Sequence, residues 1–168
     1  MSTIGFDTSN YTTSTAWTDG KTDINVRQIL YVKDGERGIR QSDGVFQHMK
    51  LMPVMYEKLS EQIDFKDVKA VGVSTRPRCV EGSYMPVFLA GEGYAKVVAN
   101  TLGVPLYEFS HQDGHIMAGI YSSGSFELLE NDFISVHLSG GTTEILKSRY
   151  NGFNFDNEII GGSKDISA

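Results

Sequence analysis

The sequence predicts an α/β fold in which helices flank a mixed β-sheet. The chain opens with three segments that have the alternation or the threonine content of strands, which indicates that the sheet begins with antiparallel strands. Apolar runs then alternate with segments of helical periodicity, as they do where helices connect parallel strands. A new group of strand-like segments starts after residue 130, which indicates a second unit. With 168 residues and 40% hydrophobic content, the chain is long enough to form a core.

The three opening strands are expected over residues 3–8, 12–18 and 24–32. The first strand ends on Asp7, and a tight turn at residues 9–11 reverses the chain into the threonine-rich second strand. The third segment alternates apolar and polar residues, as a half-exposed strand does. These strands are therefore expected to pair in antiparallel order.

Two helices and two further strands are expected next. Apolar residues recur at helical spacing over residues 45–59, and Pro53 is expected to break or kink this helix or to begin a second one. An apolar run over residues 68–74 predicts a buried strand. A second helix is expected over residues 86–102, followed by a strand over residues 104–109.

A third helix is expected to follow Ser110, and it carries two histidines. Ser110 suits the N-cap position, and Asp113 lies where a carboxylate completes a capping box. His111 and His115 are then one turn apart on one face, so both imidazoles can reach one ion. The positive end of the helix dipole disfavours protonated imidazole, which leaves the ring nitrogens available to a metal. Two capping or surface histidines without a metal are the alternative.

A strand hairpin is expected over residues 133–138 and 144–150, with one more strand over residues 153–160. This order of elements resembles a ribonuclease-H-like layer, the unit that is duplicated in ASKHA (actin-like ATPase) folds. Residues 1–130 are therefore predicted to form the first lobe, and residues 131–168 the truncated start of the second lobe.

Composition and charge argue against several classes of protein. The 15 basic and 21 acidic residues give a net charge of -6, which does not fit a general polyanion binder. The one cysteine, Cys79, allows no disulfide within the chain, as is usual in a reducing cytosol. No apolar stretch is long enough to span a bilayer, and the N-terminus lacks the layout of a signal peptide. We therefore expect a cytoplasmic protein with no membrane partner.

Three turns rich in glycine or hydroxyl groups are expected directly after strands. Their backbone N–H groups and hydroxyls suit phosphate oxygens, although hairpins need such residues for geometric reasons as well. Two such turns at matching places in two repeats are typical of the fold shared by sugar kinases, heat-shock ATPases and actin, in which nucleotide lies between the lobes. The residues predicted to bind ATP or an adenylate are Thr8, Ser9, Ser139, Gly140, Gly141, Thr142, Gly161 and Gly162.

Four motifs carry a resemblance to a known family: residues 5–9, residues 45–48, the pair His111 and His115, and residues 138–142. They occur in the same order as in the TsaD/Gcp family, formerly called glycoprotease or O-sialoglycoprotein endopeptidase. The resemblance implies a metal-dependent, nucleotide-binding protein that transfers a threonylcarbamoyl group to an adenosine of tRNA. It also implies that the two histidines and a later aspartate hold one iron or zinc ion per chain, which polarises the transferred carbonyl.

The chain departs from the family pattern at three places, which indicates a divergent subgroup. Residues 10–13 are Asn-Tyr-Thr-Thr where members have Cys-Asp-Glu-Thr, so an expected acidic residue is missing. Residues 76–78 are Arg-Pro-Arg in place of Gly-Pro-Gly, and Thr142 replaces a histidine. The third metal ligand of relatives lies beyond Ala168, so this chain alone is expected to be inactive.

Three residues outside the histidine pair have predicted roles. Asp7, at the end of the first strand, is the predicted catalytic residue and would hold a metal- or phosphate-bound water; a turn-capping aspartate is the alternative. His48 is either a packed, hydrogen-bonded histidine or part of a cleft. His137 alternates with Val136 and Leu138 along a strand, so it is expected to point away from them in a structural role.

Two other functions remain open at this point. The missing acidic and glycine residues favour a non-catalytic ASKHA-fold partner of the TsaB type, which acts by dimerisation. A metalloendopeptidase is the weaker alternative, because the chain has no His-Glu-x-x-His motif. We expect a homodimer or a complex with a TsaB-type paralogue, because an uncovered lobe surface favours association. tRNA is the further partner that the full-length family implies.

Overall fold

The computed structural model describes residues 1–36, 38–138 and 143–163 of the chain. The chain divides into two compact units. Unit 1 comprises Met1–Pro77 and Gly82–His111, and unit 2 comprises Arg78–Glu81 and Gln112–Ala168.

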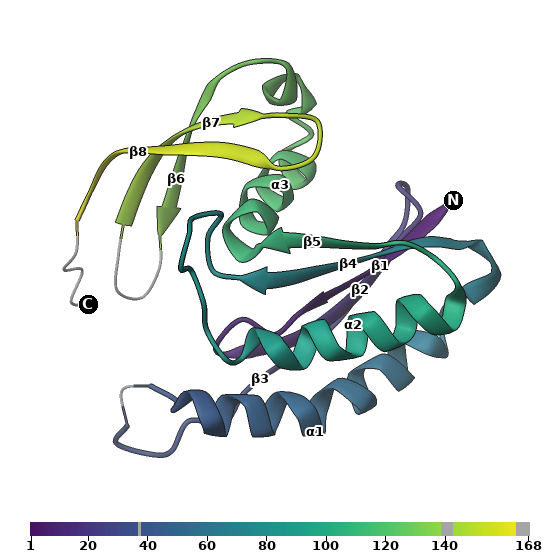
Figure 1. The fold of residues 1–168 in the computed structure, drawn as a ribbon. Coiled ribbons are helices and arrows are strands. Elements are labelled where there is room, and N and C mark those ends of the chain that lie inside the picture. Colours follow the sequence, from purple (N-terminus) through teal and green to yellow (C-terminus); the bar gives the residue numbers. More distant parts are fainter. Residues whose placement is uncertain (37, 139–142, 164–168) are drawn as a thin grey trace. The chain divides into compact units, whose positions relative to one another are not determined.

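Unit 1 is built on a five-stranded mixed sheet with the strand order β3-β2-β1-β4-β5 (Figure 1). The antiparallel strands are β1 (Ser2–Asp7), β2 (Thr12–Thr18) and β3 (Asp23–Ile29). The strands β4 (Val68–Arg76) and β5 (Leu106–Ser110) continue the sheet in parallel to β1. The expected mixed sheet is therefore confirmed, and each predicted strand of this unit lies within a few residues of an observed one.

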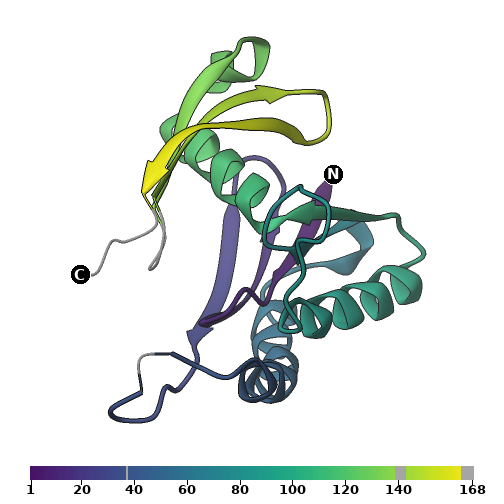
Figure 2. The ribbon, with the colours of Figure 1, turned by 60° about the vertical axis from the view of Figure 1, so that its left-hand side comes forward.

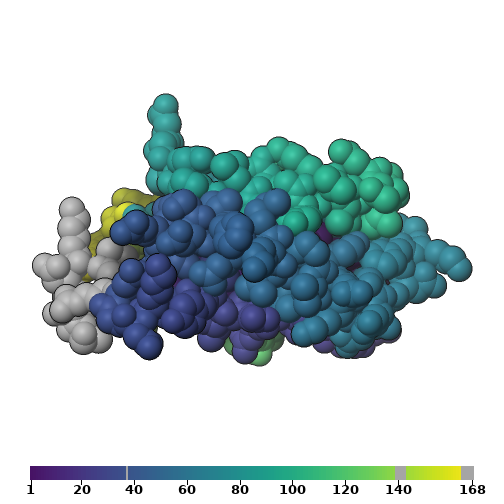
Figure 3. Space-filling model, turned by 90° about the horizontal axis from the view of Figure 1, so that it is seen from below, coloured from purple at the N-terminus to yellow at the C-terminus, as the bar shows by residue number. Residues whose placement is uncertain are grey.

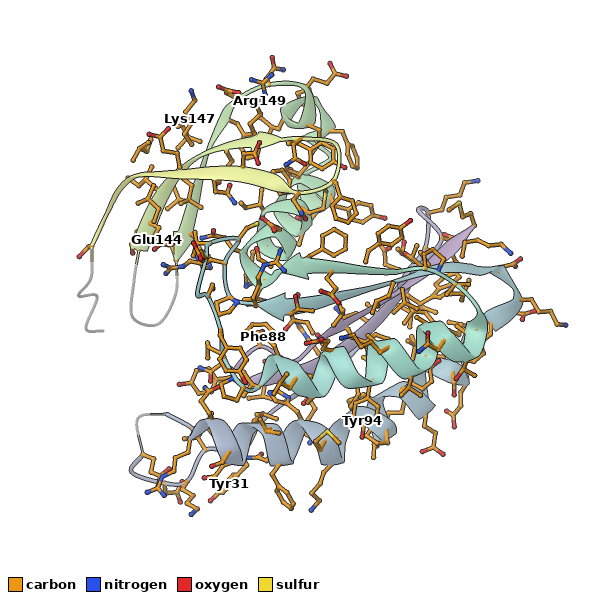
Figure 4. The ribbon with its side chains drawn as sticks, viewed as in Figure 1. Tyr31, Phe88, Tyr94, Glu144, Lys147 and Arg149 are labelled. Carbon is orange, nitrogen blue, oxygen red and sulfur yellow. The ribbon has the colours of Figure 1, made fainter. Side chains whose placement is uncertain are left out.

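Two helices, α1 (Gln41–Ser60) and α2 (Phe88–Leu102), cover the same face of this sheet (Figures 1 and 2). Alternate residues of each central strand point toward the helices, so the apolar ones among them are buried. The Tyr94 hydroxyl of α2 donates to the Met49 carbonyl of α1 at 3.0 Å, which ties the two helices together (Figure 4). A 3-10 turn (Phe65–Asp67) precedes β4. The buried core residues of unit 1 are Ile4, Phe6, Met52, Leu59, Val68, Val71, Val73, Ala95 and Ala99.

α1 is one continuous helix with Pro53 inside it, so this proline neither breaks the helix nor begins a second one, and the expected alternative of a kink stays a prediction. A proline in a helix interior costs about 3 kcal/mol, since it removes one hydrogen bond and crowds the preceding turn. The side chains of Met52, Met55 and Leu59 are fully buried around this position. Burial of a large apolar side chain contributes about 1.5–3 kcal/mol, so the three together outweigh the proline.

Unit 2 contains α3 (His111–Ser123), whose first residue still belongs to unit 1, and a 3-10 turn (Phe126–Glu130). A three-stranded antiparallel sheet follows, in the order β6 (Phe133–Leu138), β7 (Thr143–Tyr150) and β8 (Phe155–Ser163). None of the helices in the described ranges combines the length and the apolar character that a membrane span requires.

The boundary between the two compact units falls after His111, earlier in the chain than the boundary after residue 130 that was predicted between the lobes. Ile116 and Ile120 of α3 are buried together with Leu146 and Phe155 of the second sheet, which places most of α3 in unit 2. The physical reason is that the apolar face of a short helix belongs to whichever sheet buries it. The assignment of residues 1–130 and 131–168 to two lobes of a duplicated fold stays a prediction.

Gly161 and Gly162 lie inside β8 rather than in the turn that was expected after it. They pair with Ile145 and Glu144 of β7, next to an irregularity in the register. A Cβ atom on Gly162 would lie 2.5 Å from the Thr143 carbonyl oxygen, so only glycine fits this close approach of two backbones. The expectation of a turn at this place is wrong, and the glycine at position 162 has a packing reason.

Candidate functional site

The candidate site of unit 1 lies where three parallel strands end. The strands β1, β4 and β5 are parallel, so their carboxyl ends meet at one edge of the sheet. Asp7 is the last residue of β1, Ser74 lies near the end of β4, and His111 directly follows β5. Topology therefore brings together a carboxylate, a hydroxyl and an imidazole that are far apart in the sequence.

Asp7 and His111 form a close pair at this edge. The Nδ1 atom of His111 lies 2.8 Å from Oδ2 of Asp7, and the two side chains are 29% and 25% exposed. The other carboxylate oxygen, Oδ1, accepts the backbone N–H of Ser9 at 2.7 Å. The Phe88 ring, in the first turn of α2, lies with its centroid 6.2 Å from that of the His111 ring (Figure 4). The imidazole is thus held by a carboxylate and flanked by an aromatic ring.

The surroundings of Asp7 keep it ionised. Burial alone raises the pKa of this carboxyl group, but the hydrogen bond and the charge of His111 act in the opposite direction, and bonds from Ser74 and Ser9 add to them. Together they lower the pKa of Asp7 to about 2, from an ordinary value of 3.8. The group is therefore a hydrogen-bond acceptor at any physiological pH.

Thr8, a predicted cofactor-binding residue, anchors α2 with its side chain. Its buried hydroxyl donates to the Val87 carbonyl at 2.8 Å and accepts the Gly91 N–H at 3.0 Å. A Cβ atom on Gly91 would lie 2.8 Å from this hydroxyl oxygen, so the contact depends on glycine. Because the Thr8 hydroxyl already makes these two hydrogen bonds, Thr8 would bind a cofactor through its backbone. The backbone N–H of Ser9 already donates to Asp7. Both cofactor roles stay predictions.

His48 is a packed, hydrogen-bonded histidine, the first of the two interpretations that its sequence context left open. It is fully buried in α1, and its Nδ1 atom lies 2.7 Å from the Thr13 hydroxyl oxygen of β2. Desolvation lowers the pKa of His48, against smaller upward contributions from the charge of Asp7 and the backbone of Asn10. The folded state therefore favours the neutral imidazole.

The stability of the protein is expected to fall as the pH drops below about 6.5, because of His48. Its pKa is lowered on folding, so below the ordinary value of 6.5 the unfolded chain binds a proton that the folded chain does not. A single such group contributes a slope of up to about 1.4 kcal/mol per pH unit. Denaturant titrations of the wild type and of His48→Gln between about pH 5 and 7.5 check this prediction. Equal slopes in the two proteins would contradict it.

Unit 2 contains a second group of polar side chains, centred on Glu144. This buried carboxylate forms an ion pair with the Arg78 guanidinium, N to O 2.8 Å, and accepts a hydrogen bond from the Gln112 amide at 3.2 Å (Figure 4). Its Oε2 atom lies 3.9 Å from Nδ1 of His137. The His137 and His115 rings have centroids 5.6 Å apart. The cluster of Arg78, Gln112, His137 and Glu144 therefore contacts one of the two predicted metal ligands, His115, through the ring of His137.

Glu144 and Gln112 were not among the residues predicted from the sequence. His137 pairs directly with Glu144 across β6 and β7, and directly paired residues have their side chains on the same face of the sheet. Strand register was therefore the signal that could have found the pair. The predicted direction of His137 is confirmed, because Val136 and Leu138 are exposed while His137 points to the buried side of the sheet.

The two predicted metal ligands both lie on α3, but the boundary between the compact units falls directly after His111. His111 belongs to unit 1 and His115 to unit 2. Within residues 1–36, 38–138 and 143–163, no three His, Cys, Asp or Glu side chains form a group that could hold a metal. The predicted cofactor-binding residues Ser139, Gly140, Gly141 and Thr142 lie outside the described residues.

A family model described as "TsaD: tRNA N6-adenosine threonylcarbamoyltransferase" matches residues 35–164. A curated relative of that name from Christiangramia forsetii is 32% identical over 117 residues, covering 68% of this chain and 32% of its own length. Another from Pyrobaculum calidifontis is 28% identical over 171 residues, covering 98% of this chain and 48% of its own length. The chain thus spans about a third to a half of the length of these relatives.

Solved structures share the fold at low sequence identity. YeaZ from Pseudomonas aeruginosa superposes with a TM-score of 0.55 at 11% identity, over 97% of this chain and 66% of that protein. The ethanolamine utilization protein EutJ from Carboxydothermus hydrogenoformans gives a TM-score of 0.51 at 17% identity, over 96% and 53% of the two chains. These similarities concern the fold alone, and they confirm the predicted ribonuclease-H-like, ASKHA-type class.

Proposed function

Because the chain belongs to the family of tRNA N6-adenosine threonylcarbamoyltransferases, we propose that it supplies metal- and nucleotide-binding residues for the transfer of a threonylcarbamoyl group to a tRNA adenosine. The matched part of this chain covers only 32% and 48% of the length of two relatives that carry this name. We therefore propose that the reaction needs a second lobe and that the chain alone is inactive.

His111 and His115 are the proposed ligands of one iron or zinc ion. The observation that carries this proposal is their position four residues apart at the beginning of α3, directly after the edge where the parallel strands end. Imidazole nitrogens suit both metals, so the donor type fits the proposed ion. Further ligands would have to come from outside the described residues, in which no group of three donors occurs.

The remaining site residues are proposed to bind the nucleotide. When bound, the metal would polarise the carbonyl of the transferred group as a Lewis acid. The proposed contacts of ATP or an adenylate are the backbone of Thr8, the residue Ser9, the segment Ser139–Thr142, and Gly161 with Gly162.

Zinc titration of the purified chain and of two variants tests the metal site. His111→Ala and His115→Ala are each expected to weaken zinc binding at least about tenfold, because a site with one imidazole fewer loses one of its few donors. Ser122→Ala is the matched control, since Ser122 is an exposed residue of the same helix and is expected to bind zinc as the wild type does. Zinc binding that is unchanged in both histidine variants would overturn the proposed metal site.

A non-catalytic ASKHA-fold partner of a TsaD-type enzyme is the second candidate function. Large apolar side chains are exposed on α1 (Phe46, Met49) and on α2 (Leu89, Val97). The two helices themselves lie side by side on one face of unit 1 (Figure 3). We propose that a paralogous chain packs on these residues, while a homodimer stays a prediction that light scattering can check. Metal content separates the candidates, because a partner of this kind needs no metal of its own.

A further inference from the structure

We propose that Asp7 is a positioning residue, which holds His111 in the tautomer with hydrogen on Nδ1 and thereby keeps the ring lone pair on Nε2, the nitrogen that a ligand would contact; the identity of that ligand as a metal rests on the proposed function. In this role Asp7 acts through His111, in place of the direct catalytic role that its place at the end of β1 predicted.

The geometry of the pair determines which nitrogen carries the hydrogen. Nδ1 of His111 lies 2.8 Å from Oδ2 of Asp7, which is a hydrogen-bonding distance. An ionised carboxylate has acceptor atoms only, so the shared hydrogen must be on Nδ1. In the neutral ring the lone pair is then on Nε2, which is the nitrogen that would ligate a metal or accept a proton.

Both partners are held in place independently of each other. The Oδ1 atom of Asp7 accepts the Ser9 N–H at 2.7 Å, so the carboxylate has little freedom to rotate. Asp7 ends β1, and His111 follows β5, so each residue is attached to a strand of the same sheet. The Phe88 ring lies beside the imidazole, tilted by 56° to it. Sites held by strand ends are more precise than sites on loops, which is what a positioning role requires.

The arrangement has the chemistry of a carboxylate–histidine pair. In known metal centres the ligating imidazole donates its other ring N–H to a carboxylate or a carbonyl, and loss of that partner weakens metal binding about 10–100-fold. Within unit 1, Asp7 is the carboxylate that accepts the ring N–H of His111. Both of its oxygens accept hydrogen bonds, one from a backbone N–H and one from the ring, as a carboxylate that orients a neighbouring imidazole requires.

Nitrogen-15 NMR of the metal-free full chain measures the tautomer directly. The experiment uses histidine-labelled protein at about pH 8.5, where an ordinary imidazole is neutral, and His111→Gln identifies the signals of this ring. We expect Nδ1 of His111 to be protonated and Nε2 unprotonated in the wild type. In Asp7→Asn, whose amide can donate or accept, we expect a mixture of both tautomers. Ser74→Ala is the control that keeps the carboxylate, and its His111 signals should match the wild type.

The wild-type spectrum alone can overturn the proposal, whether or not the Asp7 variant folds. A His111 ring protonated on Nε2 and not on Nδ1 would exclude it, and so would an Asp7→Asn variant that is folded by circular dichroism with an unchanged tautomer. Zinc titration adds a second measurement, in which Asp7→Asn is expected to bind about 10–100-fold more weakly. The expected tautomer without any zinc binding by the wild type would leave Asp7 a positioning residue and would reject the metal instead.

Discussion

Leu146→Ala is expected to destabilise unit 2 by about 2–5 kcal/mol, which is enough to unfold a unit of this size. Leu146 lies on β7 and is fully buried against Ile116 and Ile120 of α3 and against Phe155 of β8. Its removal leaves a cavity between the helix and the sheet, and a small core cannot relax to fill it. Hydrogen exchange followed by NMR resolves the two units, and loss of protection is expected in residues 112–138 and 143–163.

Leu138→Ala is the matched control for this prediction. It makes the same chemical change in the same sheet, at a side chain that is 71% exposed. Because the side chain already faces solvent, the variant is expected to stay within about 0.5 kcal/mol of the wild type. Similar losses of protection in both variants would show that the burial assigned to Leu146 does not hold.

Gly91→Ala is expected to destabilise unit 1 by about 1–3 kcal/mol, although alanine is the better helix former. The added Cβ atom would lie 2.8 Å from the Thr8 hydroxyl oxygen and 3.3 Å from its methyl carbon. Thr8 cannot move away without losing its bonds to Val87 and Gly91. Denaturant unfolding monitored by circular dichroism measures the change.

Gly93→Ala, two residues further along α2, is expected to change the stability in the opposite direction. No atom lies within 4 Å of a Cβ atom at this position, so only the helix propensity changes. Alanine is favoured by about 0.5–1 kcal/mol, so this variant is expected to be more stable than the wild type. In a Thr8→Ala background the cost of Gly91→Ala should shrink, since the clashing atoms are gone. If Gly91→Ala destabilised the Thr8→Ala protein as much as the wild type, the clash with the Thr8 side chain would not be the cause.

Most secondary-structure elements could be predicted from local patterns. The strand over residues 12–18 was predicted with the bounds observed for β2, and the second helix with its observed end at Leu102. These predictions succeed because periodicity and turn residues act over a few neighbours. A helix break at Pro53 and a turn at Gly161–Gly162 were wrong predictions, because burial and strand pairing from distant segments override the local preference.

The candidate site was predictable in its residue types but not in its contacts. Asp7 and His111 were both selected as functional, yet the sequence assigned them separate roles, a catalytic carboxylate and a metal ligand. Their 2.8 Å contact joins residues 104 positions apart, and it exists because β1 and β5 run parallel with β4 between them. The Glu144 cluster depends in the same way on the register of β6 and β7.

The amino-acid sequence by itself determined the order of the elements, the α/β class and the family, because these follow from local periodicity and from motifs of a few residues. Only the tertiary structure decided which polar groups meet: Asp7 with His111, Thr8 with Gly91, and Glu144 with Gln112 and Arg78. The physical reason is that a hydrogen bond requires atoms within about 3 Å, and only the packing of strands and helices in the folded chain brings distant residues that close.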